Sequence, residues 1–414
     1  MKYVKLIGVV ATAVILFTLS ALADSSGRIY GKITTVDGDV FQGLIRWDKN
    51  EGNWVDLLNG NKELRTKHGD KRDRKKYRDR ERSIELFGIT IAKTGSSWSW
   101  SGSAQSGMRF GHLRSLEVID DDAALLTLKS GEEVELEGGS TDVGDGVREI
   151  IIEDKVEGEI ELEWEDIERI DFMETDPDLV SNLGQRLYGT ITVRRGDQYT
   201  GFVCWDMDEL FSRDILDGDQ KGRRRKVKFA KIKSIERYSS SASTVTLVNG
   251  DELLLRGTND VDESNGGIAI SDPGLGQVVV RWDEFDRLDF TAIPQGIPYG
   301  EFDGGRPLEG TVFTEDGDSY QGRICWDNDE EFTWEILDGN YHDVEFDIEF
   351  GLIKEIKKKS YRSAIVTVWD GRSFRLRGSN DVDEDNKGIF ITTADGDETE
   401  VDWEDFDRVE FVRK

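Results

Sequence analysis

The sequence predicts an all-β protein made of three tandem repeats, each of them a pair of small five-stranded barrels. Short runs rich in Val, Ile, Thr, Tyr and Phe alternate apolar with polar residues, and Asp-Gly, Asn-Gly or Arg-Gly pairs separate these runs as hairpin turns would. The same pattern returns at a fixed period, because Trp205 and Trp326 lie 121 residues apart, as do Trp282 and Trp403.

The chain begins with a predicted signal peptide, residues 1–23. Lys2 and Lys5 precede an apolar stretch, and Ala21-Leu22-Ala23 forms a small-residue cleavage site. An uncleaved membrane anchor is the alternative, since the apolar run is nearly long enough to span a bilayer. After cleavage we expect no transmembrane span and a periplasmic or secreted location.

Three repeat units follow the signal peptide: unit 1 (27–174), unit 2 (185–291) and unit 3 (305–414). The opening segments are GKITTVDGDVFQGLIRWDKNE in unit 1, GTITVRRGDQYTGFVCWDMDE in unit 2 and GTVFTEDGDSYQGRICWDNDE in unit 3. Unit 1 is longer than the others by an insertion of 39 residues, which falls within 61–105.

Each unit is itself duplicated. In unit 2, residues 190–209 align without gaps on residues 244–263, and the closing segments VKFAKIKSIE and VRWDEFDRLD follow one pattern. The chain therefore holds six modules of about five short strands, each with a single helical or 3-10 turn at an aromatic residue. Five short strands cannot bury both faces of an open sheet, which favours closure of each module into a barrel.

The order of strand, Gly-Asp turn, strand, glycine, strand, Asp-rich turn, strand, 3-10 turn and short strand resembles the small barrels of the SH3-like and Sm-like superfold. The Sm family implies RNA binding through basic and aromatic loop residues. This chain places acidic residues in those loops, so we do not carry that function over.

The most specific chemical feature is an acidic turn of the form Asp-x-Asp-Glu. Oxygen ligands at alternate positions suit a hard cation such as Ca²⁺, the one cofactor that the sequence suggests. The candidate metal ligands are Asp206, Asp208, Asp260, Asp262, Asp327, Asp329, Asp381, Asp383 and Asp385. The alternative is that these side chains accept hydrogen bonds from their own turn backbone.

The tryptophans at matched repeat positions are predicted to be core anchors rather than sugar-stacking residues. Trp98 and Trp100 differ from them, because they lie in the insertion, where no repeat requires them. They are the tryptophans that we expect to bind a partner.

Two basic segments stand out on an acidic chain. The insertion contains Arg74, Lys75 and Lys76, and unit 2 has a basic loop, 223–226, that includes Arg223, Arg224 and Arg225. Either segment could bind an anionic partner. The alternative is a solvated loop whose positive charge balances the acidic surface of the protein itself.

Cys204 and Cys325 occupy the same repeat position, directly before a tryptophan, where we expect the side chain to face outward. In an oxidising compartment a disulfide between them is a candidate, and free or intermolecular thiols are the alternative.

A formal net charge of -31 disfavours nucleic acid as a partner. With three histidines and no nucleophile-base pairing in the sequence, we expect no enzyme. The sequence favours a non-catalytic, exported scaffold that binds a protein or a component of the cell envelope. A calcium-dependent binding module is the alternative, and a carboxylate-based hydrolase ranks third.

Overall fold

The computed structural model describes residues 25–63, 84–86, 89–92, 103–138 and 140–413. Strands and single-turn 3-10 helices are its regular elements, which confirms the all-β prediction. Among these residues, no helix has the length and apolar character needed to cross a membrane. The predicted signal peptide lies outside the described residues.

Each repeat unit contributes ten strands to the large sheets, and the strands coincide with the alternating segments of the sequence. Unit 1 forms β1 (Tyr30–Thr35), β2 (Val40–Trp47), β3 (Leu57–Glu63), β6 (Ser103–Arg109), β7 (Leu113–Asp120), β8 (Ala123–Leu128), β9 (Glu133–Glu137), β10 (Ile150–Asp154), β11 (Gly158–Leu162) and β12 (Ile167–Phe172). The insertion adds the hairpin of β4 (Ile84–Leu86) and β5 (Ile89–Ala92).

The other two units repeat this series of strands. Unit 2 forms β13 (Tyr188–Val193), β14 (Gln198–Cys204), β15 (Ile215–Gln220), β16 (Arg223–Lys228), β17 (Ile232–Ser239), β18 (Ala242–Leu247), β19 (Glu252–Arg256), β20 (Ile268–Asp272), β21 (Gly276–Val280) and β22 (Phe285–Phe290). Unit 3 forms β23 (Glu309–Thr314), β24 (Ser319–Cys325), β25 (Ile336–Tyr341), β26 (Val344–Glu349), β27 (Ile353–Ser360), β28 (Ser363–Val368), β29 (Ser373–Leu376), β30 (Ile389–Thr392), β31 (Glu398–Val401) and β32 (Phe406–Phe411).

Short 3-10 turns begin at four of the predicted aromatic residues. They are η2 (Phe110–His112), η3 (Trp164–Asp166), η4 (Phe229–Lys231) and η7 (Phe350–Leu352), whereas η5 (Asn259–Val261) and η6 (Tyr299–Glu301) fall outside the pattern. Each of the four turns buries its first aromatic side chain, so the turn places a large apolar group beneath the strands.

In the described part of the chain the three large sheets are open, and the predicted closed barrels are not found. Their strand orders are β11-β10-β2-β1-β12-β7-β8-β9-β3-β6, β16-β15-β19-β18-β17-β22-β13-β14-β20-β21-β26-β25 and β29-β28-β27-β32-β23-β24-β30-β31. The sheet faces are buried mainly within each unit, where the tryptophans of the two halves contact each other, and a few residues of neighbouring units add to the core.

The two halves of each unit exchange strands, which is why they are not separate modules. In unit 2, β13 and β14 come from the first half, yet they pair with β22 and β20 of the second half. Conversely, β15 and β17 of the first half pair with β19 and β18 of the second half. Units 1 and 3 show the corresponding exchange.

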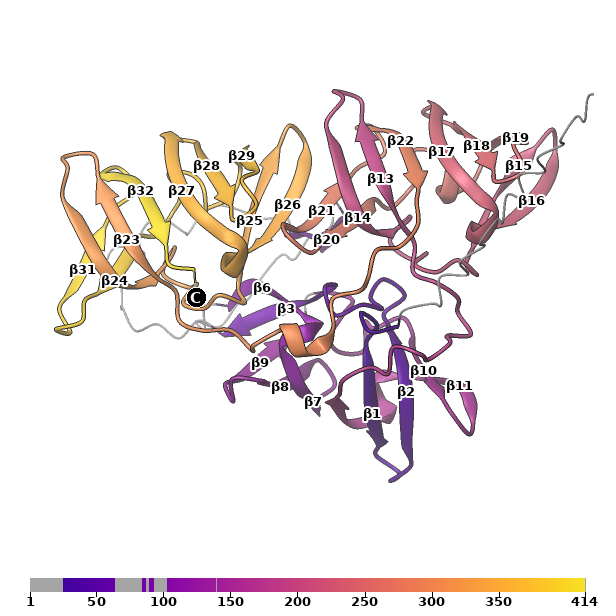
Figure 1. The fold of residues 1–414 in the computed structure, drawn as a ribbon, viewed down its shortest axis with the longest axis horizontal. Helices are drawn as coiled ribbons and strands as arrows, with labels where there is room; N and C mark the ends of the chain where they lie inside the picture. The colour runs from indigo at the N-terminus through magenta and orange to yellow at the C-terminus, as the bar shows by residue number, and fades with distance from the viewer. Residues whose placement is uncertain (1–24, 64–83, 87–88, 93–102, 139, 414) are drawn as a thin grey trace, which may run out of the picture.

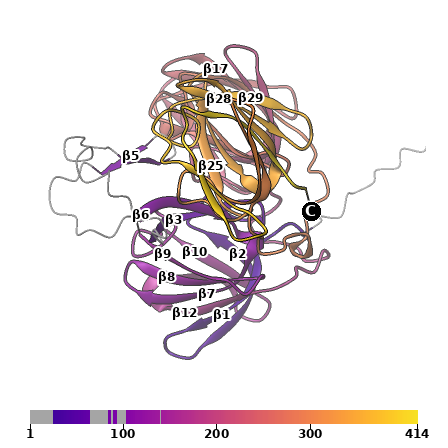
Figure 2. The same ribbon diagram turned by 90° about the vertical axis from the view of Figure 1, so that its left-hand side faces the viewer.

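Figure 1 shows units 2 and 3 side by side in one layer, with unit 1 beneath them, and Figure 2 shows the same stacking from the side. A strand pair joins the two upper units directly: β21 of unit 2 lies antiparallel to β26 of unit 3. The core clusters cross the unit boundaries as well, since Phe202 of unit 2 and Trp334 of unit 3 pack into the core of unit 1.

In each unit, a carboxylate near the start of the third strand forms an ion pair with a residue of another unit. This carboxylate, Asp56, Asp214 or Glu335, accepts two backbone N–H groups of the turn before it. In every case its cationic partner belongs to another unit. The pairs are Arg186 with Asp56, Arg46 with Asp214, and Lys62 with Glu335.

The tryptophans at matched positions are buried, as predicted. Trp47, Trp205 and Trp326 have no exposed surface. Each contacts the tryptophan of the second half edge to face, with ring centroids 6.2 to 6.4 Å apart.

Candidate cation sites at the acidic turns

The acidic turns follow the second strand of each unit, directly after the buried tryptophan. The two residues after the tryptophan have positive φ angles, 53° at Asp206 and 59° at Met207 in unit 2, which Asp tolerates better than most residues. Trp205 and Glu209 then form a bridge that closes a tight hairpin. This geometry turns the first Asp side chain inward, where Asp48, Asp206 and Asp327 are all buried.

A second carboxylate arrives from the other half of the unit. In unit 2 this residue is Asp260, which the sequence alignment places at the position equivalent to Asp206. Its backbone carbonyl accepts the Trp205 indole N–H at 3.1 Å, and its side chain accepts the Asp217 N–H at 2.5 Å. Asp142 and Asp381 make the same two contacts in units 1 and 3.

The residue that donates its backbone N–H to the first Asp differs in charge between the three sites. The carboxylate of the first Asp accepts the backbone N–H of Arg148 in unit 1, of Gly266 in unit 2 and of Lys387 in unit 3. The Arg148 guanidinium lies 2.9 Å from Asp48, and the Lys387 ammonium lies 3.5 Å from Asp327. Gly266 has no side chain, so unit 2 lacks the cation that this position supplies in its neighbours.

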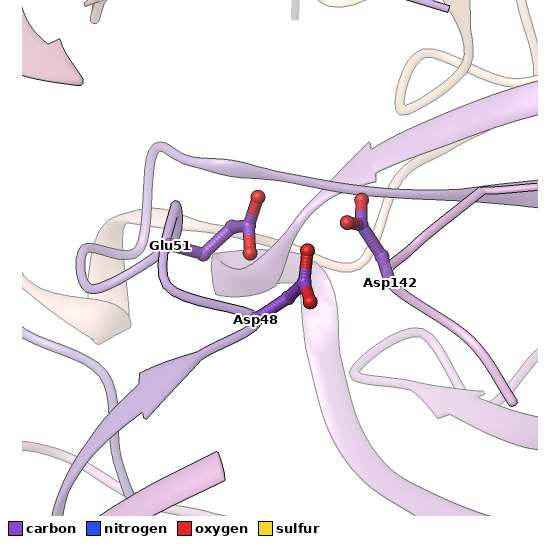
Figure 3. Close-up of side chains that lie close together, drawn as sticks. All are labelled: Asp48, Glu51 and Asp142. Atoms are coloured by element: carbon purple, nitrogen blue, oxygen red, sulfur yellow. The ribbon is translucent and has the colours of Figure 1, made fainter. Parts of the chain in front are cut away.

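Carboxylates gather closely enough in two of these sites to share a metal ion. Ligand oxygens of Asp48, Glu51 and Asp142 lie within 4.8 Å of one another, and Figure 3 shows the three side chains converging. The same spacing holds for Asp206 and its neighbours Asp208 and Glu209.

Burial makes the negative charges of these clusters costly. It raises the pKa of Asp142 to about 7 and holds the pKa of Glu51 well above its usual value. In unit 2 burial is again the main cause, and neighbouring carboxylates add to it: the pKa is about 7 for Asp206, about 6 for Asp260 and about 12 for Glu209. A bound cation would stabilise the charged carboxylates and so lower these pKa values.

Several oxygens of the turns have no hydrogen-bond partner although they are shielded from solvent. They are Oε2 of Glu51, Glu209 and Glu330 and Oδ1 of Asp208 and Asp329. Glu51 is only 3% exposed, so its free oxygen points into the cluster rather than into solvent. Buried oxygens of this kind are available as ligands for a cation.

The sites of units 1 and 2 face each other across the unit junction. Arg46 donates to the Asp208 carbonyl at 2.6 Å, and Arg148 donates to the Met207 carbonyl at 3.2 Å. Two arginines of unit 1 thus hold the backbone of the unit 2 turn, while the carboxylates of that turn remain without a basic partner.

The structure divides the predicted metal ligands into two groups. It brings together Asp206, Asp208 and Asp260 in unit 2, and Asp327, Asp329 and Asp381 in unit 3. In the other group, Asp262 and Asp383 accept N–H groups of their own turns, from Ser264 at 3.1 Å and from Asp385 at 3.0 Å, and the side chain of Asp385 is exposed. These hydrogen bonds match the alternative interpretation of the acidic turns.

Sequence reasoning did not select the carboxylates of unit 1. The sequence gives Asp48-x-Asn50-Glu51 as the first copy of the acidic turn and a degenerate turn near Asp142, but Asp48, Glu51 and Asp142 were not among the predicted metal ligands. The repeat alignment held the missing signal, since it places Asp48 with Asp206.

The predicted partner-binding residues have different outcomes. Trp98, Trp100, Arg74, Lys75 and Lys76 lie outside the described residues. Arg223, Arg224 and Arg225 are exposed on β16.

The structure does not contain the candidate disulfide. Cys204 and Cys325 are free, and Cys204 is buried against Phe211, Met207 and Val279 rather than facing outward. The side chain faces away from its own sheet core, as the pattern indicates, but unit 1 covers that face.

Comparisons with known proteins give no match: no protein-family model, no curated protein and no solved structure is similar to the chain. The function is therefore argued from the geometry alone.

Proposed function

We propose that the protein is a non-catalytic binding scaffold that acts outside the cytoplasm, where the expected signal peptide would direct it. The observation that carries the proposal is the set of buried ion pairs between units. Arg186 and Asp56 are almost fully buried and lie 2.9 Å apart, and Asp56 also accepts hydrogen bonds from Ser271 and from its own turn. Such contacts hold the units at fixed spacings.

Fixed spacing is what a multivalent binding protein needs. Weak contacts on several units add up to useful avidity only when the units can engage one partner together. The repeated sheets would present these contacts, and the insertion of unit 1 would add the tryptophans and basic residues that the repeats do not require.

The test replaces residues 64–102 with a short Gly-Ser linker, which keeps Lys62 and its ion pair with Glu335. We expect an unchanged melting transition and loss of the partner that the intact protein retains from envelope extracts. If the shortened protein retains the same partner, the insertion is not the binding element.

A second candidate function is calcium-linked stabilisation of the unit junction, and Gly266 specifically favours it. Units 1 and 3 neutralise the site with Arg148 or Lys387, whereas unit 2 leaves Asp206, Asp208 and Glu209 for an external cation. The ligands would be hard oxygens, which Ca²⁺ prefers.

The matched test is Gly266→Lys. An added Cβ at Gly266 would come no closer than 3.4 Å to Asp206, so a side chain fits. Calcium at about 100 times its Kd should stabilise the wild type by about 2.7 kcal/mol, which raises the melting temperature relative to chelator. Gly266→Lys should melt higher in chelator and gain little from calcium, while Gly266→Met controls for side-chain size. A wild type that melts identically in calcium and chelator would contradict this function.

A further inference from the structure

The chain itself shows how the edge of one unit joins the edge of another. At the junction of β21 and β26, Val278 lies opposite Phe346 and Val279 lies opposite Glu345. Side chains strengthen the pair: the Arg281 guanidinium lies 2.6 Å from Glu345. Edge strands carry unpaired backbone donors and acceptors, and this junction satisfies both edges at once.

The counterparts of these two strands stand at the ends of their sheets in the described part of the chain. β31 is the counterpart of β21 in unit 3, because the pair Thr392–Glu398 repeats the pair Ser271–Gln277 at an offset of 121 residues. By the same offset β16 of unit 2 is the counterpart of β26. Figure 1 places β31 and β16 at opposite ends of the longest axis, so the two strands of one molecule cannot meet.

The two edges carry opposite charges. β16 exposes four consecutive basic side chains, Arg223 to Lys226, of which Arg224 also pairs with Asp217 of its own unit at 2.6 Å and stays half exposed. β31 exposes Glu398 and Glu400. When the register of the β21–β26 junction is transferred to these strands, Glu398 lies opposite Lys226 and Glu400 lies opposite Arg224.

Residues beside the strands agree with this pairing. Asp402 of unit 3 stands where unit 2 has Arg281, and Arg224 stands where unit 3 has Glu345. The Arg281–Glu345 ion pair of the internal junction would therefore become an Asp402–Arg224 pair, with its signs exchanged and its attraction kept.

We propose that the protein assembles head to tail, with β31 of one copy adding to β16 of the next. Two β16 edges repel each other, as do two β31 edges, so only the unlike pair can form. A contact between different surfaces of identical chains can propagate from copy to copy, and because β31 and β16 lie at opposite ends of the longest axis the product is an open chain of molecules along that axis. This assembly goes beyond the proposed scaffold function and does not require a cation.

A second acidic edge, β11, fits β16 less well. In the internal junction Arg372 pairs with Asp272 at 2.5 Å. The position of Arg372 is taken by Asp251 in unit 2, and the position of Asp272 is taken by Thr393 beside β31 but by Asp154 beside β11. Pairing with β11 would bring two carboxylates together, whereas pairing with β31 would not.

The test uses two charge-reversed variants, Glu398→Lys/Glu400→Lys and Arg224→Glu/Lys226→Glu, in sedimentation velocity with chelator present. The mass of the wild type should rise beyond that of a dimer with concentration at low salt. It should fall to that of one chain in about 1 M NaCl, where the Debye length is about 3 Å. Neither variant alone should associate, because in each the residues at positions 398 and 400 carry the same charge as the residues at positions 226 and 224 that lie opposite them.

An equimolar mixture of the two variants should associate, since each supplies the edge that the other has lost, and this recovery excludes misfolding as the cause. The β11 variant Glu159→Lys/Glu161→Lys is the matched control and should associate like the wild type. The proposal is overturned if the wild type stays monomeric at about 100 µM in low salt, where electrostatic attraction is strongest. It is also overturned if the reversals leave association unchanged, or if the β11 reversal abolishes it.

Discussion

One side chain determines whether the acidic site of each unit contains its own cation. Arg148, Gly266 and Lys387 donate the same backbone hydrogen bond to the first Asp of the turn, yet only the arginine and the lysine bring a positive charge with it. The sites of units 1 and 3 therefore contain a positive charge that offsets the first Asp, and the site of unit 2 does not. The backbone arrangement is the same in all three.

Lys387→Gly should convert the site of unit 3 into one that resembles unit 2. The ammonium is partly solvated and 3.5 Å from Asp327, so we expect a loss of about 1 kcal/mol in chelator. Calcium should restore this loss, as measured by the melting temperature with and without the ion. Lys387→Arg keeps the charge and should behave like the wild type. Equal melting of Lys387→Gly in both conditions would contradict the comparison between units.

Glu349 links unit 3 to unit 1 and should make stability fall in acid. Burial alone would raise the pKa of Glu349, but the Arg109 guanidinium at 3.2 Å and His112 outweigh it, and the net pKa lies below its usual value. A carboxyl group with a lowered pKa contributes stability above its unfolded pKa, and the contribution is lost as pH falls through the folded value.

The measurement is the free energy of unfolding from about pH 6 to about pH 3 for the wild type and Glu349→Gln. The variant should be less stable near neutral pH and should lose less stability on acidification. Parallel pH profiles for the two proteins would show that this carboxylate does not contribute to the acid sensitivity.

At the scale of elements, a glycine in the second strand of each unit permits the exchange of strands between halves. A Cβ at Gly201 would lie 2.5 Å from the Ser271 carbonyl oxygen, and one at Gly43 or Gly322 would lie even closer to the carbonyl oxygen of Glu153 or Thr392, at 2.0 and 2.2 Å. The repeated glycine of the sequence is thus required by the approach of β20, or its counterpart, to the strand.

Gly201→Ala should therefore destabilise the protein by about 1–3 kcal/mol, because the added methyl group must push β14 and β20 apart. The urea midpoint measures this loss. Gly146→Ala is the control, since a Cβ there makes only ordinary contacts, the nearest at 3.4 Å. Equal midpoints for the two variants would mean that the sheets tolerate the wider spacing.

At the scale of the whole molecule, buried ion pairs join units that each have a sheet core of their own. Arg186→Ala would leave Asp56 charged and without its cation at the junction of units 1 and 2. Breaking a buried pair in this way typically costs about 3–5 kcal/mol. Calorimetry should show a lower melting temperature and separate transitions for the units.

The control is Arg169→Ala, which removes an exposed pair with Glu117 and should cost at most about 1 kcal/mol. A single transition at the wild-type temperature for Arg186→Ala would contradict the proposed role of the junction.

Local structure could be predicted from the sequence because it depends on neighbouring residues. Alternation and Gly-containing turns located the β13–β14 hairpin, and the matched tryptophans were recognised as core. The exchange of strands could not be predicted, because both halves carry the same pattern and β14 is suited equally to a partner from either half.

The acidic site was predicted in part for the same reason. Asp206 and Asp208 were identified from spacing along the chain, but Asp260 joins them only because the halves exchange strands. The contrast between Gly266 and Lys387 depends on knowing which backbone N–H meets the first Asp, and this is a tertiary contact.

The exchange of strands also determines how the chain can fold. β13 forms a hairpin with β14 at once, but Gly189 also pairs with Phe290, so the other edge of β13 has no partner until almost the whole unit has been made available. High contact order of this kind slows folding and leaves edges exposed in the meantime. A cut in the turn between β17 and β18 would yield two fragments that each lack neighbours for several strands, and they should fold only by complementing each other. The smallest unit that completes its sheets within one chain is thus the pair of halves.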